Sequence, residues 1–432
     1  MLRAFGQAFR TPDLRRKILF TLAIMTLYRL GTFIPTPGVS AQNVNMCVAQ
    51  TSDQAAGILD MFNLFSGGAL LQLSVFSLGI MPYITASIIM QVMRVAVPRL
   101  DDLYKEGQSG QTKITQYTRY LTVFLAVLQS TTMITMANSG QMFPGCAADV
   151  IPDGNFGTYL LMVLVMTTGS IVIMWFGETI TEKGVGNGMS LLIFTSIIAS
   201  MPQQFASIAQ TGGYGKVAII IAIILVIAVA VVFVESSERR IPVQYARRMV
   251  GRRTYGGSTT YIPLKINMAG VVPVIFSSSV IMLPTLFAQF GDANSAWVQW
   301  INRNTDSSSP WYLILQAVLI MGFAFFYTSI TFNPDEVADN LKRYGGFVPG
   351  YRAGRPTAQY LRFVVNRLTV VGAIYLALVA SVPTLVMIPL NLLPQQMPFG
   401  GTTLLIMVSV GLQTVKDINA QLQQHHYEGF LK

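Results

Sequence analysis

The run KVAIIIAIILVIAVAVVFV, from Lys216 to Val234, decides the fold class of this 432-residue chain. After its first lysine it holds 18 residues in a row without a polar or charged side chain. A helix needs about 20 such residues to cross the ~30 Å hydrocarbon core of a bilayer. Because that core offers no water, the backbone must satisfy its own hydrogen bonds, which a helix does and an open sheet does not. The run therefore predicts a transmembrane helix.

Comparable apolar runs recur along the whole chain, and they predict ten transmembrane helices. These cover residues 18–35, 75–97, 120–138, 157–177, 188–206, 216–234, 269–290, 312–332, 368–390 and 401–418. The composition agrees, since 52% of the residues are hydrophobic and 11% are charged, against about 25% charged in a soluble domain. We therefore predict an all-α integral membrane protein.

The distribution of Lys and Arg orients these helices. With the N-terminus inside, the inner segments hold 25 of the 29 basic residues, and the outer segments hold only Lys216 and Arg303. Basic loops stay on the cytoplasmic side of a membrane. This predicts a multi-pass protein of the cytoplasmic (inner) membrane with both termini, segments 1–17 and 419–432, in the cytoplasm. The net charge of +10 is then largely a topology signal rather than a sign of nucleic-acid binding.

Residues for covalent or metal chemistry are missing from the sequence. It has no P-loop, no H-E-x-x-H and no G-x-S-x-G, so we expect no enzyme and no cofactor. Inside the spans Arg29 and Arg94 are nearly the only ionisable residues, and Arg94 is expected to reach the inner surface. Asp and Glu are absent from the span centres, which argues against a proton-coupled transporter.

The two cysteines, Cys47 and Cys146, both fall in predicted outer segments. A disulfide between them is conceivable on that ground. Without a C-x-x-C motif or a second pair, two free thiols are the favoured interpretation.

The outer segment 36–74 contains no Lys or Arg, and its second part is apolar. The stretch from Ile58 to Ser74 reads ILDMFNLFSGGALLQLS, which is too short and too broken by glycine to span. One interpretation is an amphipathic helix on the outer membrane surface. The other is a movable segment folded back into a cavity of the protein.

Several strings resemble the SecY family, in the family order along nearly the whole chain. They are FNLFSGGAL at 62–70, LGIMPYITASII at 78–89, EG at 106–107, QYTRY at 116–120, GVGNG at 184–188, RRIPV at 239–243, LKINMAGV at 264–271, FNP at 332–334, ADNLK at 338–342, GFVPG at 346–350 and FGGT at 399–402. Each string alone is weak, but together they are specific.

The resemblance implies two inverted-topology halves of five helices, 18–206 and 207–418, around a central hourglass pore. An apolar ring would form its constriction, at Ile80, Ile84, Met189, Ile193, Ile275 and Ile406. Such a ring seals by dewetting and by fitting around a passing chain, without selecting its sequence. Taken without the resemblance, each of these residues would be assigned to ordinary helix packing.

The resemblance also implies a plug over about 58–73, which closes the outer funnel at rest. Its central residues would be Phe62, Asn63, Phe65, Ser66, Gly67 and Gly68. A lateral gate would lie between the second and third spans on one side and the seventh and eighth on the other. Signal sequences would part this gate and reach lipid, because burial of apolar surface from water is worth about 25 cal/mol per Å².

Two long basic loops, 235–268 and 333–367, are the expected cytoplasmic docking surfaces. In the family such loops contact the ribosome and the SecA ATPase, and basic side chains suit ribosomal RNA phosphates. The candidates are Arg239, Arg240, Arg247, Arg248, Arg252, Arg253, Arg352 and Arg355. Arg352 aligns with a critical family arginine, but Ala353 replaces the usual proline, so Arg355 competes with it. The alternative is that these charges only set topology and meet anionic lipid.

The resulting hypothesis is a passive channel, the central subunit for moving unfolded preproteins outward and apolar segments sideways. The resemblance implies SecE and SecG as partner subunits, with energy from SecA or from the elongating ribosome. A small-solute transporter would need a polar midplane site and coupling carboxylates, which the sequence lacks. A pore-less membrane scaffold is a third possibility, against which the plug-like segment and the family strings count.

Overall fold

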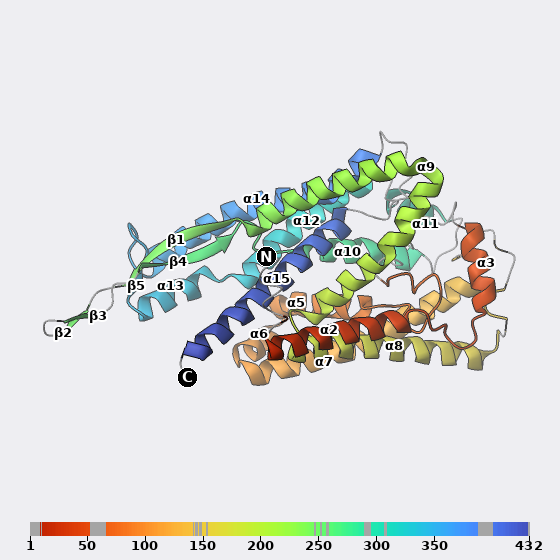
Figure 1. The fold of residues 1–432 in the computed structure, drawn as a ribbon, viewed down its shortest axis with the longest axis horizontal. Coiled ribbons are helices and arrows are strands. Elements are labelled where there is room, and N and C mark those ends of the chain that lie inside the picture. The colour runs from red at the N-terminus through yellow and green to blue at the C-terminus, as the bar shows by residue number, and fades with distance from the viewer. Residues whose placement is uncertain are drawn as a thin grey trace.

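The computed structural model describes residues 9, 11–51, 66–140, 142, 146, 149–152, 154–245, 248–250, 253–255, 259–288, 295–305, 309–387 and 401–430. Over these ranges the chain forms an elongated bundle of long helices with a small β-structure at one end (Figure 1). A helix lies over every one of the ten predicted spans.

The first half of the chain supplies one side of the bundle. Its helices are α2 (Pro12–Gly31), α3 (Ala41–Thr51), α5 (Met81–Ala96), α6 (Pro98–Lys105), α7 (Gln108–Asn138) and α8 (Phe156–Lys183). The long helix α9 (Gly188–Ser236) then carries the fifth and sixth spans together. Gly213, with φ 77° and ψ 161°, breaks α9 into two arms, which is the bend in Figure 1. This backbone conformation is open to glycine and to few other residues.

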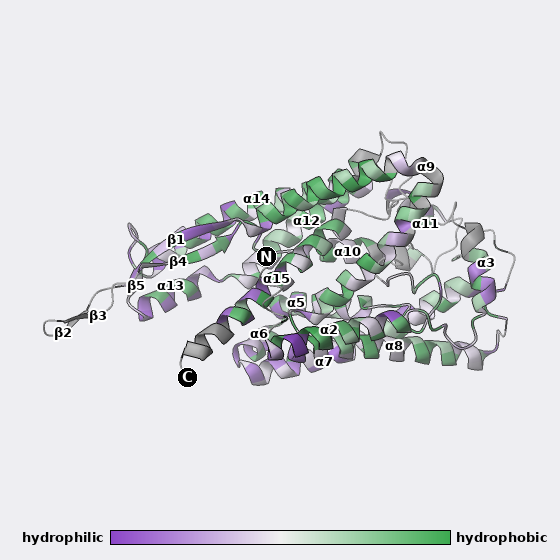
Figure 2. Cartoon of the chain, in the orientation of Figure 1, coloured by the Kyte–Doolittle hydropathy of each residue, from purple (hydrophilic) through white to green (hydrophobic). Residues whose placement is uncertain are grey.

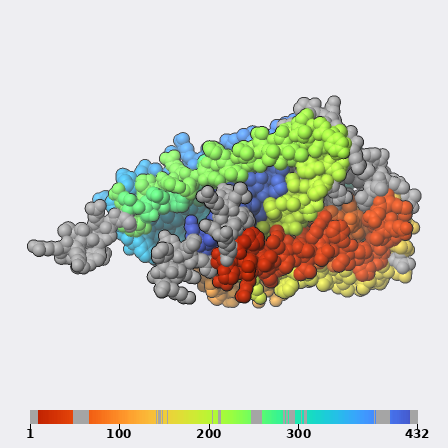
Figure 3. Space-filling model, viewed as in Figure 1, coloured from red at the N-terminus to blue at the C-terminus, as the bar shows by residue number. Residues whose placement is uncertain are grey.

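The second half follows from this bend. Its helices are α10 (Val272–Ala288), α11 (Ala296–Thr305), α12 (Pro310–Thr331), α13 (Pro334–Arg343), α14 (Arg355–Met387) and α15 (Gly401–Phe430). Several helices outrun their predicted apolar spans, because α7, α14 and α15 continue into polar sequence that hydropathy does not detect. In the space-filling view α15 lies between the two arms of α9, above α2 (Figure 3).

The long helices consist mostly of hydrophobic residues (Figure 2). On the second arm of α9, Val226, Val229 and Phe233 are 70%, 70% and 74% exposed. Among the described residues, six helical segments have the length and hydropathy of a membrane span. A soluble protein rarely exposes so large a contiguous apolar surface. The chain is therefore a multi-pass membrane protein.

A small antiparallel sheet adds to the expected helices at the predicted inner end. It pairs β1 (Glu238–Tyr245) with β4 (Thr259–Lys265) and with β5 (Gly346–Phe347), in the order β4-β1-β5. A short ribbon of β2 (Arg248–Val250) and β3 (Arg253–Tyr255) extends from its tip. Ile241 and Val243 alternate with exposed residues along β1, the period-two pattern of a half-buried strand. Segments 235–268 and 333–367 were predicted from the sequence only as loops between spans, and the alternation in β1 was not used.

Candidate functional site

The six predicted ring residues lie in one apolar cluster at the middle of the bundle, which we call the waist. Ile80, Ile193 and Ile406 are buried at 2%, 3% and 0% exposure, while Ile84, Met189 and Ile275 are partly buried against them. They come from α5 and the N-cap residue before it, the first arm of α9, α10 and α15, so both halves of the chain contribute. Tertiary packing thus brings together residues that are more than 300 positions apart.

Local turns deliver these residues near the beginnings of their helices. Gly79, at φ 56°, ends the turn before α5, so Ile80 and Ile84 stack one helical turn apart, with Ile84 N–H donating to the Ile80 carbonyl at 3.1 Å. Asn187 caps α9 by accepting from the N–H groups of Met189 and Ser190. An N-cap side chain fixes where a helix begins. These two starts set the level at which the waist residues enter the core.

Met189 reaches the waist past Gly177 of α8. A Cβ added at Gly177 would lie 2.2 Å from Met189 Sδ, so a larger residue at 177 would require the thioether to move. Close approach of helices at glycine is common in membranes. The unbranched methionine side chain can then follow an irregular path into the cluster.

The part of the predicted plug that the structure describes, residues 66–73, is buried in the protein. Ala69, Leu70 and Leu73 are all at or below 1% exposure, and Ser66 Oγ accepts from the Leu70 N–H at 3.1 Å. An amphipathic helix on the membrane surface does not fit these residues, whereas a re-entrant segment does. Phe62, Asn63 and Phe65 lie outside the described residues.

Gly67 and Gly68 form the turn at the start of this segment, with φ of 70° and 90°. The carbonyl of Gly67 accepts a hydrogen bond from Arg29 Nη1, in the last turn of α2. This contact was not anticipated from the sequence. The one available signal was the presence of a cation near the outer end of a span.

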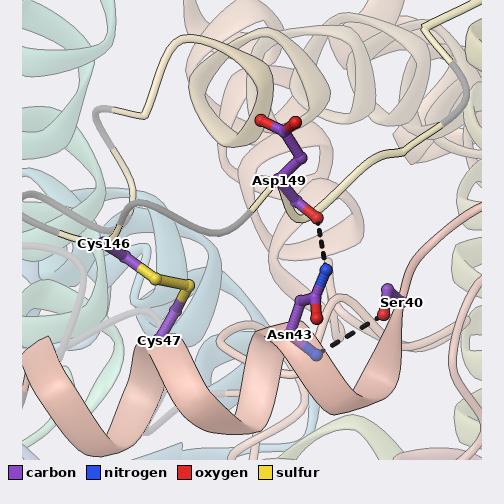
Figure 4. The surroundings of a disulfide bond; sticks show 5 residues. All are labelled: Ser40, Asn43, Cys47, Cys146 and Asp149. Atoms are coloured by element: carbon purple, nitrogen blue, oxygen red, sulfur yellow. Dashed lines mark hydrogen bonds between the residues drawn. A yellow bond between two sulfur atoms is a disulfide. The ribbon is translucent and has the colours of Figure 1, made fainter.

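The two cysteines form a disulfide, so the interpretation as free thiols is wrong. Cys47 of α3 is bonded to Cys146, with the Cα atoms 5.4 Å apart (Figure 4). On the same helix, Asn43 Nδ2 donates to the Asp149 carbonyl at 2.8 Å. The pairing joins segments 99 residues apart, and sequence spacing does not specify which outer segments become neighbours.

Comparison with known proteins now identifies the family. The SecY family profile matches residues 74–415, which is most of the chain.

The chain belongs to the SecY family.

Curated relatives agree with the SecY assignment over their full lengths. The chain is 55% identical to the protein translocase subunit SecY of Streptomyces scabiei over 439 residues, with 100% of both chains covered. It is 53% identical to that of Mycobacterium tuberculosis over 441 residues, again with 100% of both covered. The chain is therefore a subunit of a translocation channel and not itself an enzyme.

Solved SecY-type structures share the fold at low sequence identity. One described as the structure of a protein conducting channel has a TM-score of 0.63 and 16% identity, over 94% of this chain and 91% of that one. Sec61 in a canine ribosome-channel complex has a TM-score of 0.60 and 14% identity, over the same shares. The architecture of ten helices in two halves around a pore is thus that of the SecY fold.

In SecY terms, the predicted lateral gate corresponds to α5 and α7 on one side and α10 and α12 on the other. Within each pair the helices pack side by side, and α5 also contacts α10 across the two halves. In the last turn of α5, Arg94 Nε is 3.2 Å from Asp101 Oδ1, and its guanidinium lies 3.4 Å from the ring centroid of Tyr104. That Arg94 reaches the inner membrane surface stays a prediction. Hydrogen bonds from Lys105 and Arg94 hold the pKa of the Asp101 carboxyl below its usual range.

The structure joins the two predicted basic loops of this SecY chain into one unit. Ile241, Val243 and Leu264 from the first loop pack with Val348 and Leu361 from the second in one buried cluster. Strand β5 of the second loop also pairs with β1 of the first. The two docking candidates are therefore neighbouring parts of one surface.

The candidate arginines on this surface differ in what the structure describes. Arg239, Arg240, Arg352 and Arg355 have exposed side chains, and Arg240 Nε also bonds to Glu238 Oε1 at 2.8 Å. The remaining four lie at or beside the β2–β3 ribbon. The backbone is described for Arg248 and Arg253 only, and Arg247 and Arg252 fall outside the described residues.

Proposed function

We propose that this chain is the central pore subunit of a cytoplasmic-membrane translocase, and that the waist is its seal. It passes unfolded preproteins outward and releases apolar segments sideways into lipid. The observation that carries the proposal is the convergence of six apolar residues, from four helices of both halves, in one buried cluster. An apolar constriction excludes water and ions while offering no hydrogen-bond partner to a passing chain.

The plug and the gate complete the cycle. Residues 58–73 close the outer side at rest, supported by the burial of 66–73. A signal sequence parts α5 and α7 from α10 and α12. An apolar segment then partitions into lipid, because each Å² of apolar surface removed from water stabilises it by about 25 cal/mol. A polar segment has no such gain and continues outward.

Both termini lie in the cytoplasm in this proposal. The Lys and Arg distribution supports this orientation. The Cys47–Cys146 disulfide supports it too, because disulfides persist outside the reducing cytosol, and both cysteines belong to predicted outer segments.

The partners follow from the same orientation. The joined basic surface, with Arg239, Arg240, Arg352 and Arg355 exposed, faces the cytoplasm and suits SecA or ribosomal RNA. One structural relative is itself described in a ribosome-channel complex. SecE clamps the two halves, and SecG binds at the periphery.

Replacement of waist residues by serine tests the seal. We expect Ile84→Ser with Ile275→Ser to raise the resting ion leak of the reconstituted channel severalfold, because polar side chains let water wet the constriction. The matched control is Ile208→Ser with Ile220→Ser, which alters a buried apolar cluster of α9 that shares no residue with the waist cluster.

A second readout follows the substrate. A preprotein arrested in transit should crosslink to a cysteine placed at Ile84. An unchanged leak in the waist variant, or an arrested chain that contacts only lipid-facing positions, would show that the pathway lies elsewhere.

A further inference from the structure

Arg29 is a cation in an unexpected place, the last turn of α2 at the outer end of the first predicted span. The basic residues of this chain otherwise gather on the inner side, and an arginine within a span is costly. Among the described residues, no carboxylate forms an ion pair with it. Its charge therefore needs another partner.

That partner is the turn at the start of the described plug. Arg29 Nη1 donates to the Gly67 carbonyl, 38 residues further along the chain. The same nitrogen lies 3.4 Å from Thr32 Oγ1, and the guanidinium lies 4.9 Å from the ring centroid of Phe33. The cation is thus half-buried between its own helix end and the plug backbone.

The turn fits this position because residue 67 is glycine. Its φ is 70°, and an added Cβ would lie 3.0 Å from Arg29 Nη1 and 3.3 Å from Ser196 Cα of α9. Beside it, Tyr28 OH and Ser196 Oγ are hydrogen-bonded at 2.7 Å and join α2 to α9. The carbonyl of Gly67 therefore sits in a socket made by α2 and α9, with Arg29 as its donor.

The other end of the same segment is held differently. The Thr36 N–H donates to the Leu73 carbonyl at 3.1 Å, and the Val75 N–H donates to the Ile34 carbonyl at 2.9 Å. These are backbone bonds of a short antiparallel bridge, which also pairs Pro35 with Ser74. Residues 73–75 are thus a fixed root, whereas the turn at Gly67 is held by a side chain that can rotate away.

We propose that Arg29 is a latch, a positioning residue whose bond to the Gly67 carbonyl holds the plug turn in its socket and so favours the closed channel. This rests on the function proposed above. A hydrogen bond from a charged donor is among the stronger single contacts in a protein. Its loss should raise the population of the displaced plug roughly tenfold or more.

The socket offers its own probe. A Cβ at position 67 would lie 3.5 Å from Ser196 Cβ, within the ~3.5–4.5 Å span of a disulfide. In the reconstituted full complex, Gly67→Cys with Ser196→Cys should crosslink under mild oxidation while the turn is seated. Because these two substitutions crowd the turn and remove the Tyr28–Ser196 bond, every variant is compared in this same background. Each single cysteine variant controls for exchange with the native bridge.

In that background, Arg29→Met should lower the yield of the 67–196 crosslink, and without the added cysteines it should raise the resting ion leak roughly tenfold, because the leak follows the displaced population. Arg29→Lys keeps the charge and should fall between Arg29→Met and the unmodified channel. Arg303→Met, which removes an exposed arginine of α11 on the same side, should change neither readout. If Arg29→Met does not accumulate in membranes, Arg29→Gln is measured by the same criteria.

Crosslinking and leak at the unmodified level in an inserted Arg29 variant would overturn the latch. If the waist variants leak and the Arg29 variants do not, the latch alone fails. If the waist variants are also tight, the proposed function fails with it.

Discussion

The Cys47–Cys146 disulfide allows a quantitative prediction, because the length of the loop that it closes sets how much it stabilises the protein against unfolding. The bridge joins residues 99 positions apart. Closing a free loop of about 100 residues is worth about 4.7 kcal/mol in the chain-entropy account. Part of this loop is α5 and α7, which stay inserted in the membrane and are not free. The parts of the loop outside α5–α7 are residues 48–80 and 139–145, about 40 residues together, for which the same account gives about 4 kcal/mol.

We therefore expect reduction, or Cys47→Ser, to lower the free energy of unfolding by about 3 to 5 kcal/mol. Thermal unfolding of the purified complex with and without reductant measures this change. Cys47→Ser with Cys146→Ser is the matched control, because reductant should have no effect on a chain without the bridge.

Counting thiols tests the bridge itself. A maleimide of high mass should label the denatured protein only after reduction, and then at two positions. Labelling of both cysteines without prior reduction would show free thiols. An unfolding midpoint insensitive to reductant would show that the bridge forms but does not stabilise the outer segments.

Two further changes test the waist and the docking surface. Gly177→Val should force Met189 Sδ, which lies 2.2 Å from the position of an added Cβ, toward the waist, and slow preprotein export severalfold in a vesicle assay. Normal export at normal protein levels would show that the thioether has another path. Arg352→Glu should weaken ribosome binding and lower the salt dependence of log K by about one unit, and Arg355→Glu tests its competitor in the same titration. If both variants bind the ribosome with the same affinity as the unmodified channel at every salt concentration, these charges serve topology alone.

The helices were predictable because membrane crossing leaves a strong local signal. A run such as Lys216–Val234 predicts a membrane span by itself, because the hydropathy of its residues does not depend on contacts with the rest of the chain. The ends of the helices were less predictable. α14 begins at Arg355, well before its apolar run, because the amphipathic turns that precede the run are stabilised by packing against the sheet.

The sheet and the pairing of the cysteines escaped prediction for a related reason. The alternation in β1 is short, and β5 is a two-residue strand that has meaning only beside Tyr245. Likewise Cys47 and Cys146 each carry no sign of the other. Contacts between segments this far apart depend on how the helices between them pack.

By itself, the amino-acid sequence determined that this chain crosses a membrane many times, because hydropathy acts residue by residue, and its charges predict that the basic loops lie on one side. The resemblance to the SecY family also supplied the six predicted ring positions. Only the tertiary structure decided that these six side chains meet, that the outer cysteines bond, and that Arg29 of the first helix holds the carbonyl of Gly67. Each of these depends on distances between helices, which no local stretch of sequence encodes.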